Sequence, residues 1–150
     1  MGHAQPEETI FSEFLIAVML HNQAVADRLG LQPVDVAAVM LLEMHGPLAV
    51  GKIAEELRLP SASTTRLIDR LERAGYARRV RGERDRRTVT VELVEDGLDA
   101  YIAACRTSRR HLDEIARHYG AEQVPLLLNL LFRVGAAYRS AAEDLREDAT

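Results

Sequence analysis

Cysteine is almost absent from this chain of 150 residues. The single cysteine, Cys105, excludes an intramolecular disulfide and any metal site built from several cysteines. Its place on the apolar face of an expected helix favours a buried, inert thiol over a redox sensor. The five histidines form no HExxH motif and no close pair with a carboxylate at ligand spacing. The sequence therefore predicts neither a metal nor a cofactor.

Features of an enzyme or a membrane protein are also missing. There is no glycine-rich phosphate loop and no prominent carboxylate pair, and Ser61 and Ser63 have no histidine base near them in the sequence. No apolar run approaches the roughly 20 residues that span a bilayer. The N-terminal residues do not form a basic region followed by an apolar stretch and a cleavage site. We expect a soluble, cytoplasmic protein with no enzymatic activity.

Acidic residues outnumber basic ones overall, but positive charge is concentrated in one segment. The net charge is −4, and 18 of the 19 basic residues are arginine. Nine arginines and only four acidic residues fall between positions 61 and 91, a local charge of +5, whereas both flanks are acidic. A charge distribution of this kind is expected when one face of a protein meets a polyanion. The alternative interpretation is that these arginines belong to an ordinary solvent-exposed surface without a binding role.

Apolar periodicity predicts helices on both sides of the basic segment and within it. The second of these helices is apolar all round, Met40 included, which predicts burial. After Gly75 the period changes to two, which indicates strands. The expected helices cover residues 6–29, 33–44, 51–57, 61–74, 98–120 and 125–143, with a brief strand over 48–50.

The helix over residues 61–74 has two contrasting faces. Thr64, Leu67, Ile68 and Leu71 share the inner face, and Ser63, Arg66 and Arg70 form a stripe on the opposite, outer face. A short helix, a tight turn and a second helix of this kind are typical of a helix-turn-helix, whose second helix enters the major groove of DNA. We expect Ser61 to cap this helix.

A cationic hairpin follows the helix-turn-helix and is interpreted as a wing. Its strands are expected near residues 77–81 and 88–93, with a loop over 82–86. Arg84, Arg86 and Arg87 at the tip are expected to reach a minor groove, where narrow segments attract guanidinium groups. Asp85 is expected to orient a neighbouring arginine.

A compact winged helix uses only about the middle third of the chain, so the amphipathic terminal helices have apolar faces left over. Their expected partner is a second copy, which would place two recognition helices in successive major grooves, roughly 34 to 36 Å apart on a pseudo-palindromic site. The predicted fold is mainly α with a small β-hairpin wing. Its parts are an N-terminal dimerisation helix (1–32), a winged helix-turn-helix lobe (33–94) and C-terminal dimerisation helices (95–150).

The order of these elements resembles the MarR family of bacterial transcription regulators over about residues 10 to 145. The most specific pieces are LEMHGPLAVGKIAEELRLPSASTTRLIDRLERAGYARR and GERDRRTVTVEL, in which Asp85 and Arg87 occupy the family's Asp-x-Arg wing positions. The resemblance implies an obligate homodimer built from the first and last helices that binds double-stranded DNA. It further implies repression of a neighbouring or divergent gene. DNA would be released when a small, often aromatic or phenolic, molecule enters a cleft between the dimer helices and the DNA-binding lobe.

Carried over by position, the resemblance implies groove or phosphate contacts by Ser61, Ser63, Thr65, Arg66 and Arg70, and a wing contact by Arg87. His21, Met40 and Met44 are candidates for lining an effector cleft, with core packing as the alternative.

The chain departs from the family at several positions. Ala49, Pro60 and Val94 stand where family members often have a capping Thr or Ser, so three helix starts are expected to lack a side-chain cap. The cysteine of the peroxide-sensing branch and the tryptophan of the urate-responsive branch are both missing.

A second class of function stays open. The helical dimer could serve as a ligand-binding or protein-interaction module whose winged lobe contacts protein or RNA without reading DNA sequence. Steep salt dependence and strong sequence preference in binding to the protein's own upstream DNA would favour the regulator.

Overall fold

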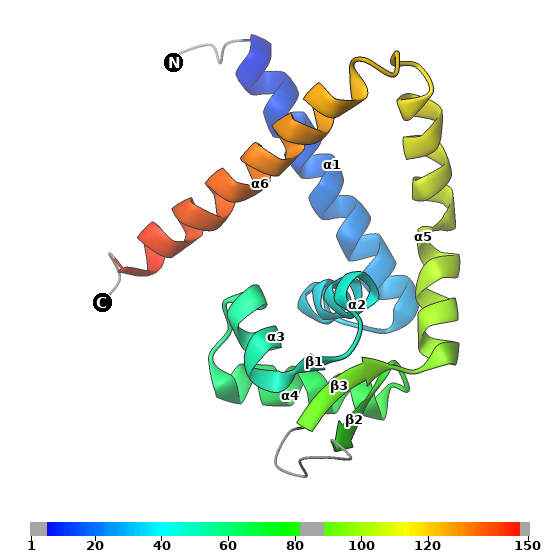
Figure 1. Ribbon diagram of the computed structural model, residues 1–150, viewed down its shortest axis with the longest axis vertical. Coiled ribbons are helices and arrows are strands. Elements are labelled where there is room, and N and C mark those ends of the chain that lie inside the picture. The colour runs from blue at the N-terminus through cyan, green and yellow to red at the C-terminus, as the bar shows by residue number, and fades with distance from the viewer. Residues whose placement is uncertain (1–5, 82–88, 148–150) are drawn as a thin grey trace. The chain divides into compact units, whose positions relative to one another are not determined.

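The computed structural model describes residues 6–81 and 89–147 of the chain. The elements are α1 (Pro6–Leu29), α2 (Pro33–His45), β1 (Leu48–Ala49), α3 (Val50–Leu57), α4 (Ser61–Arg73), β2 (Ala77–Arg81), β3 (Val89–Leu93), α5 (Glu95–Ala116) and α6 (Val124–Glu147) (Figure 1). The chain divides into two compact units, Met1–Arg106 and Thr107–Thr150, each described by itself. The predicted fold class, mainly helical with a small antiparallel sheet, is confirmed.

Most helix boundaries follow from local chemistry. The predicted starts of α1 at Pro6 and of α2 at Pro33 are confirmed, in keeping with the preference of proline for the first turn. The prediction for α5 was three residues late, because Glu95 and Asp96 stabilise the positive end of the helix dipole and draw the start forward. The helix also ends at Ala116 rather than near Gly120, and α6 continues to Glu147.

The three strands form one antiparallel sheet in the order β1-β3-β2. Leu48 of β1 is opposite Val91 of β3, and Val91 is fully buried, as its place in the period-two pattern predicts. Arg78 of β2 is opposite Glu92 on the other face of β3. Residues 82–88, which join the two longer strands, lie outside the described residues.

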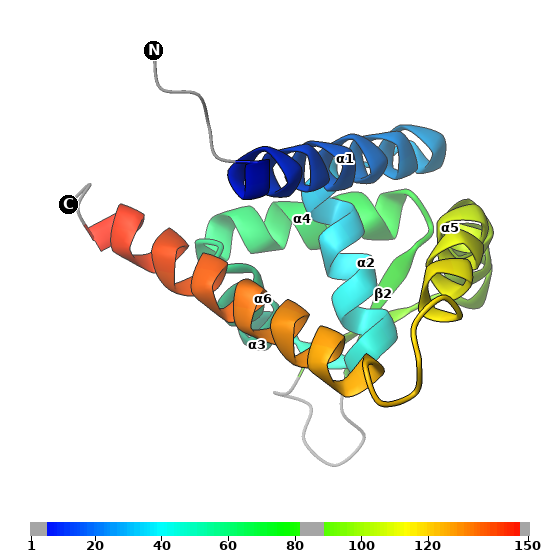
Figure 2. The ribbon, with the colours of Figure 1, turned by 90° about the horizontal axis from the view of Figure 1, so that it is seen from above.

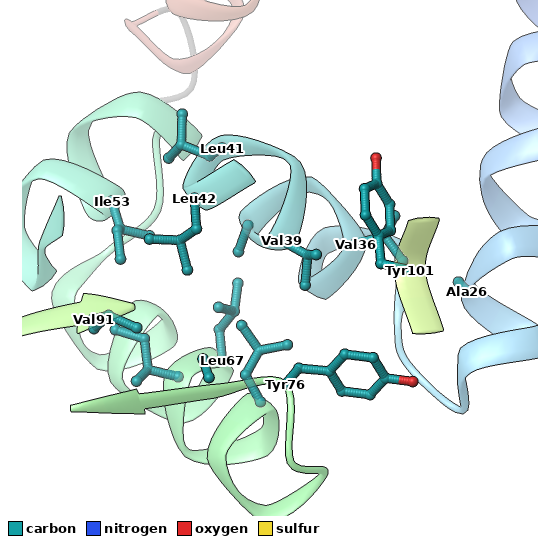
Figure 3. Packing of buried hydrophobic residues seen from close by; sticks show 14 of the residues in the cluster. Ala26, Val36, Val39, Leu41, Leu42, Ile53, Leu67, Tyr76, Val91 and Tyr101 are labelled. Atoms are coloured by element: carbon teal, nitrogen blue, oxygen red, sulfur yellow. The ribbon is translucent and has the colours of Figure 1, made fainter. Parts of the chain in front are cut away.

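The core of the first unit is the contact of α2, α3 and α4 with the sheet. Leu42, Ile53 and Leu67 project into it from the three helices (Figure 3). Figures 1 and 2 show that α2 runs across the direction of α1, whose C-terminal part reaches the same core through Val25 and Ala26. The predicted burial of Cys105 is confirmed.

Tyr76, which is part of this core, contacts both the end of α1 and the start of α5. Its buried hydroxyl donates a 2.9 Å hydrogen bond to the carbonyl of Leu29. Burial raises the pKa of Tyr76, which keeps the hydroxyl protonated and able to donate. On the other side, a Cβ placed on Gly97 would lie 2.6 Å from the Tyr76 Cα atom and 2.9 Å from the carbonyl oxygen of Gly75. Only glycine lets α5 pass the backbone this closely.

Gly97→Ala is therefore expected to lower the free energy of unfolding by about 1 to 3 kcal/mol, because the backbone must shift to admit the methyl group. Urea unfolding followed by circular dichroism measures the change. Gly51→Ala in α3 is the matched control: no atom lies within 4 Å of its added Cβ, so the higher helix propensity of alanine should leave the protein as stable or more stable. Equal effects of the two substitutions would contradict the close approach.

Within the first unit, α1 keeps an apolar surface that is not buried. The exposed side chains include Ile10, Phe11, Phe14, Ile16, Val18, Met19 and Leu20. The segment Glu8–Leu29 has a mean hydropathy of 1.3 and is, by length and composition, long enough to cross a membrane. Glu13, His21 and Gln23 interrupt this segment, so it is not one continuous apolar run.

The second unit also exposes apolar side chains along its helices. They include Leu112, Ile115 and Tyr119 after the end of the first unit, and Leu126, Leu128, Leu130, Leu131, Phe132, Tyr138 and Leu145 on α6. The spacing of several of these residues is helical, as the sequence predicts. Each unit, taken by itself, thus carries exposed apolar side chains.

Candidate nucleic-acid interface

Helix α4 is anchored by the apolar face that the sequence predicts. Thr64, Leu67, Ile68 and Leu71 are each at most 1% exposed. The Thr64 hydroxyl donates to the carbonyl of Pro60 at 3.2 Å, so this buried polar group is satisfied. Because one face is fixed by packing, the opposite face of α4 must point away from the core.

The start of α4 is not capped by a side chain. Pro60 occupies the N-cap position, and Ser61 is already the first helical residue, so the expected capping role of Ser61 is wrong. Its carbonyl instead accepts a 3.0 Å hydrogen bond from the Thr65 hydroxyl. The expectation that the helices after Ala49 and Pro60 lack side-chain caps is confirmed. The first amides of α4 therefore stay available to an acceptor from outside, such as a phosphate.

Four of the five predicted recognition-helix residues lie on the accessible part of α4. Ser61, Thr65 and Arg66 are exposed, and Ser63 is half-buried. The Arg66 side chain has no hydrogen bond or ion pair with any residue that the structure describes, so its guanidinium group is free to bind a partner molecule. A guanidinium group of this kind can donate two parallel hydrogen bonds to a phosphate or to the edge of guanine.

The fifth residue, Arg70, does not project outward as the predicted stripe requires. Its Nε donates to Asp35 Oδ2 at 3.0 Å and its Nη2 to Asp35 Oδ1 at 2.6 Å. Asp35 is 1% exposed and Arg70 31%. The hydrogen bond to Asp35 raises the pKa of Arg70 above its ordinary value, although burial opposes this. The ion pair between Asp35 and Arg70 thus links α2 to α4.

Asp35 was missed by the sequence analysis. It is the third residue of α2, and its Oδ2 also accepts a 3.2 Å hydrogen bond from the backbone amide of Gln32, closing a capping box. The signal that could have found it is an acid in the first turn of a helix that is otherwise largely apolar. A capping role was foreseeable from this position, but the partner on α4 was not.

Arg79 of β2 is a second arginine with partners inside the lobe. Its Nη2 contacts Asp69 Oδ1 at 2.8 Å, its Nη1 contacts Glu72, and its backbone amide donates to Glu72 Oε1 at 2.8 Å. Burial lowers the pKa of Arg79, but the hydrogen bond to Asp69 and the charges of both carboxylates outweigh it, and the pKa is raised. These contacts fix the end of α4 to the sheet.

The number of arginines overstates the charge that the lobe can offer to a polyanion. Arg70, Arg78 and Arg79 are paired with acids, Arg78 with Glu92 at 2.6 Å. Among the described arginines of this segment, Arg66, Arg73 and Arg81 are exposed and pair with no acidic side chain that the structure describes. The predicted wing contacts Arg84, Asp85, Arg86 and Arg87 lie outside the described residues.

The candidate effector residues occupy accessible positions in the first unit. Met40 is 40% exposed and Met44 67%, so the predicted burial of Met40 is wrong, and His21 is exposed on α1. Met40 points away from the core because Val36, Val39 and Leu42 already fill the inner face of α2. An open pocket of about 390 Å³ adjoins the Asp35–Arg70 pair, but none of the three candidates lines it. Their role in an effector cleft stays a prediction.

Comparisons with known proteins agree on one family. A sequence model described as "MarR family" matches residues 29–88. The HTH-type transcriptional regulator YcgE of Bacillus subtilis is 27% identical over 138 residues, covering 92% of this chain and 90% of the relative. The organic hydroperoxide resistance transcriptional regulator of the same organism is 38% identical over 71 residues, covering 47% of this chain and 48% of the relative.

Solved structures share the fold at low sequence identity. The crystal structure of NadR in complex with 4-hydroxyphenylacetate has a TM-score of 0.67 at 22% identity, covering 89% of this chain and 95% of the other. A mutant of MepR from S. aureus bound to an oligodeoxyribonucleotide has a TM-score of 0.64 at 15% identity, covering 89% and 99%.

Proposed function

Since this chain belongs to the MarR family of winged helix-turn-helix transcriptional regulators, we propose that it is a cytoplasmic, dimeric repressor that binds a pseudo-palindromic operator and leaves it when a small aromatic ligand binds.

The observation that carries the DNA-binding proposal is the contrast between the two faces of α4. Its inner face is fully buried, while Arg66 extends from the outer face without a partner among the described residues. A helix held in this way can lie in a major groove with Arg66 against base edges or phosphate. Ser61, Ser63 and Thr65 then lie at the same end of the helix, within reach of the sugar-phosphate backbone.

Dimerisation is supported by the apolar surface of the terminal helices. In the first unit α1 exposes Phe11 and Phe14, with ring centroids 6.4 Å apart, and in the second unit α6 exposes a row of leucines and Phe132. Contiguous apolar patches on soluble proteins mark interaction sites. A second copy is the partner that also explains two-fold operator recognition, with a spacing of roughly 34 to 36 Å between recognition helices.

Release by a ligand is proposed from the resemblance and from one structural relative. NadR was crystallised with 4-hydroxyphenylacetate, a small aromatic acid. Three accessible side chains of this chain, His21, Met40 and Met44, are the candidates for binding such a ligand. Thioether groups are flexible and make favourable contacts with aromatic rings. A ligand that prefers a dimer with the wrong spacing of recognition helices would lower the population that fits the operator.

Footprinting the DNA upstream of the protein's own gene with the purified protein tests the proposal. We expect protection of a pseudo-palindrome, with affinity that falls steeply with salt and exceeds that for random DNA by at least about 10³-fold. Small aromatic acids and phenols are then screened for loss of protection. Equal affinity for upstream and random DNA would favour the second candidate, a helical interaction module whose lobe does not read DNA sequence.

Arg66→Ala is expected to weaken operator binding by about 1 to 3 kcal/mol per half-site and to relax base preference there, because the group proposed to read the groove is removed. Fluorescence anisotropy with operator variants measures both effects. Arg106→Ala is a suitable control, since it removes an exposed arginine outside the winged lobe. If the two variants bind as well as the parent, Arg66 is not a DNA contact.

A further inference from the structure

Asp35 is a buried carboxylate that accepts three hydrogen bonds from described residues. Both of its oxygens accept hydrogen bonds from Arg70, at 2.6 and 3.0 Å, and one also accepts from the amide of Gln32 at 3.2 Å. The side chain is 1% exposed, whereas Arg70 keeps 31% of its surface in solvent beside an open pocket. The negative member of this pair is thus inaccessible, and the positive member lies at the surface of the recognition helix.

We propose that Asp35 withholds Arg70 from DNA, so that Arg70 is a positioning residue of α4 and not a phosphate contact. The inference rests on the proposed function, in which α4 enters the groove, and goes beyond it by naming a residue that limits sequence-independent affinity. Asp35 itself touches no DNA in this arrangement.

The reason is the unequal burial of the two charges. If Arg70 left Asp35 to bind a phosphate, a fully buried carboxylate would lose its counter-charge, which costs more than one solvent-exposed contact to phosphate returns. The guanidinium group of Arg70 also donates two parallel hydrogen bonds to the Asp35 carboxylate. A solvent-exposed contact to a DNA phosphate does not reproduce this geometry. Arg70 therefore stays with Asp35 when DNA approaches.

The position of Arg70 explains why its release would matter. It follows Arg66 by four residues, which places the two side chains one turn apart on neighbouring parts of the α4 surface. A freed Arg70 would add a cation beside the proposed groove contact. A phosphate contact strengthens binding to every sequence alike, so the ratio of specific to non-specific affinity would fall.

The test compares Asp35→Asn with Asp27→Asn in the full-length protein. Asp27 is exposed on α1, where it accepts a 2.8 Å hydrogen bond from Gln23, so its replacement changes the net charge equally but releases no arginine. The probes are duplexes of the upstream DNA and of random sequence with equal length, and the readout is the slope of log Kobs against log salt. For Asp35→Asn we expect several-fold tighter binding to random DNA and a slope steeper by about 0.9 per subunit. Asp27→Asn should keep the parental slope.

A second variant keeps the inference testable if Asp35→Asn folds poorly. Asp35→Asn combined with Arg70→Met removes both charges and should show the parental slope on random DNA. Arg66→Met should in contrast flatten the slope by about 0.9 per subunit. Circular dichroism of each variant shows that it is folded.

Three outcomes count against parts of this scheme. The inference is overturned if Asp35→Asn has the same slope as Asp27→Asn, or if the double variant loses as much slope as Arg66→Met, because Arg70 would then contact phosphate in the parent. Absence of salt-dependent binding by the parent itself would overturn the proposed function, and this inference with it.

Discussion

Replacing Phe14 by glutamate is expected to dissociate the proposed dimer and to lower operator affinity by about 10²- to 10⁴-fold. Phe14 is 48% exposed on α1 and contacts Phe11, in a surface that the proposed dimer would bury. A glutamate there would be taken out of water without a partner, which opposes association. In a dimer, binding of one subunit raises the effective concentration of the other at the second half-site. Monomers bind each half-site independently and lack this gain. Sedimentation measures the mass, and fluorescence anisotropy measures the affinity.

Gln23→Glu supplies the matched control for this change. It introduces the same side chain on the same helix, but nine residues further on, which is about 180° around α1 from Phe14. Gln23 is exposed, and its side chain donates a hydrogen bond to Asp27, one turn further along the same helix. We expect this variant to keep the parental mass and affinity. A Phe14→Glu protein that sediments as a dimer would show that α1 does not form the interface.

Arg70→Ala is expected to lower the free energy of unfolding by roughly 3 kcal/mol, since it leaves the buried Asp35 carboxylate without its counter-charge. The partial exposure of Arg70 places the effect at the lower end of the range for broken buried pairs. Urea unfolding followed by circular dichroism measures the change.

Two comparisons separate this effect from a general loss of arginine. Arg66→Ala lies on the same helix and has no described partner, so it should change stability by no more than about 0.5 kcal/mol. Asp35→Leu combined with Arg70→Met replaces the pair by apolar groups of similar size and should be close to neutral. A loss for Arg70→Ala no larger than that for Arg66→Ala would show that Asp35 needs no counter-charge.

Much of the fold could be predicted because it depends on patterns among residues that are close together in the sequence. The apolar period of α4 identified its four buried residues, and the change of period after Gly75 located β2 and β3. The missing side-chain caps at Ala49 and Pro60 followed from the absence of the Thr or Ser that the family often has there, whereas the residues alone wrongly indicated Ser61 as a cap. The misplaced start of α5 shows the limit of the method, since Gly97 reads as a helix breaker but lies inside a helix whose backbone packs against Tyr76.

The candidate site was predictable in outline but not in its electrostatics. Sequence spacing placed Arg66 and Arg70 on the same outer stripe, yet only Arg66 is without a described partner. The difference comes from Asp35, which lies 35 residues earlier in the chain. Spacing along a helix shows which face a residue occupies, but not which distant carboxylate packs against that face.

By itself the sequence determined most of the helices and strands of this protein, the buried face of α4 and the concentration of cations in one segment. These features depend on periodicity, capping and charge, which are properties of neighbouring residues. Only the tertiary structure decided which cations are neutralised. The packing of α2 on α4 buries Asp35 against Arg70, and the packing of β2 beside α4 gives Arg79 its two carboxylates. These contacts join residues far apart in the chain, so they exist only once the core has formed.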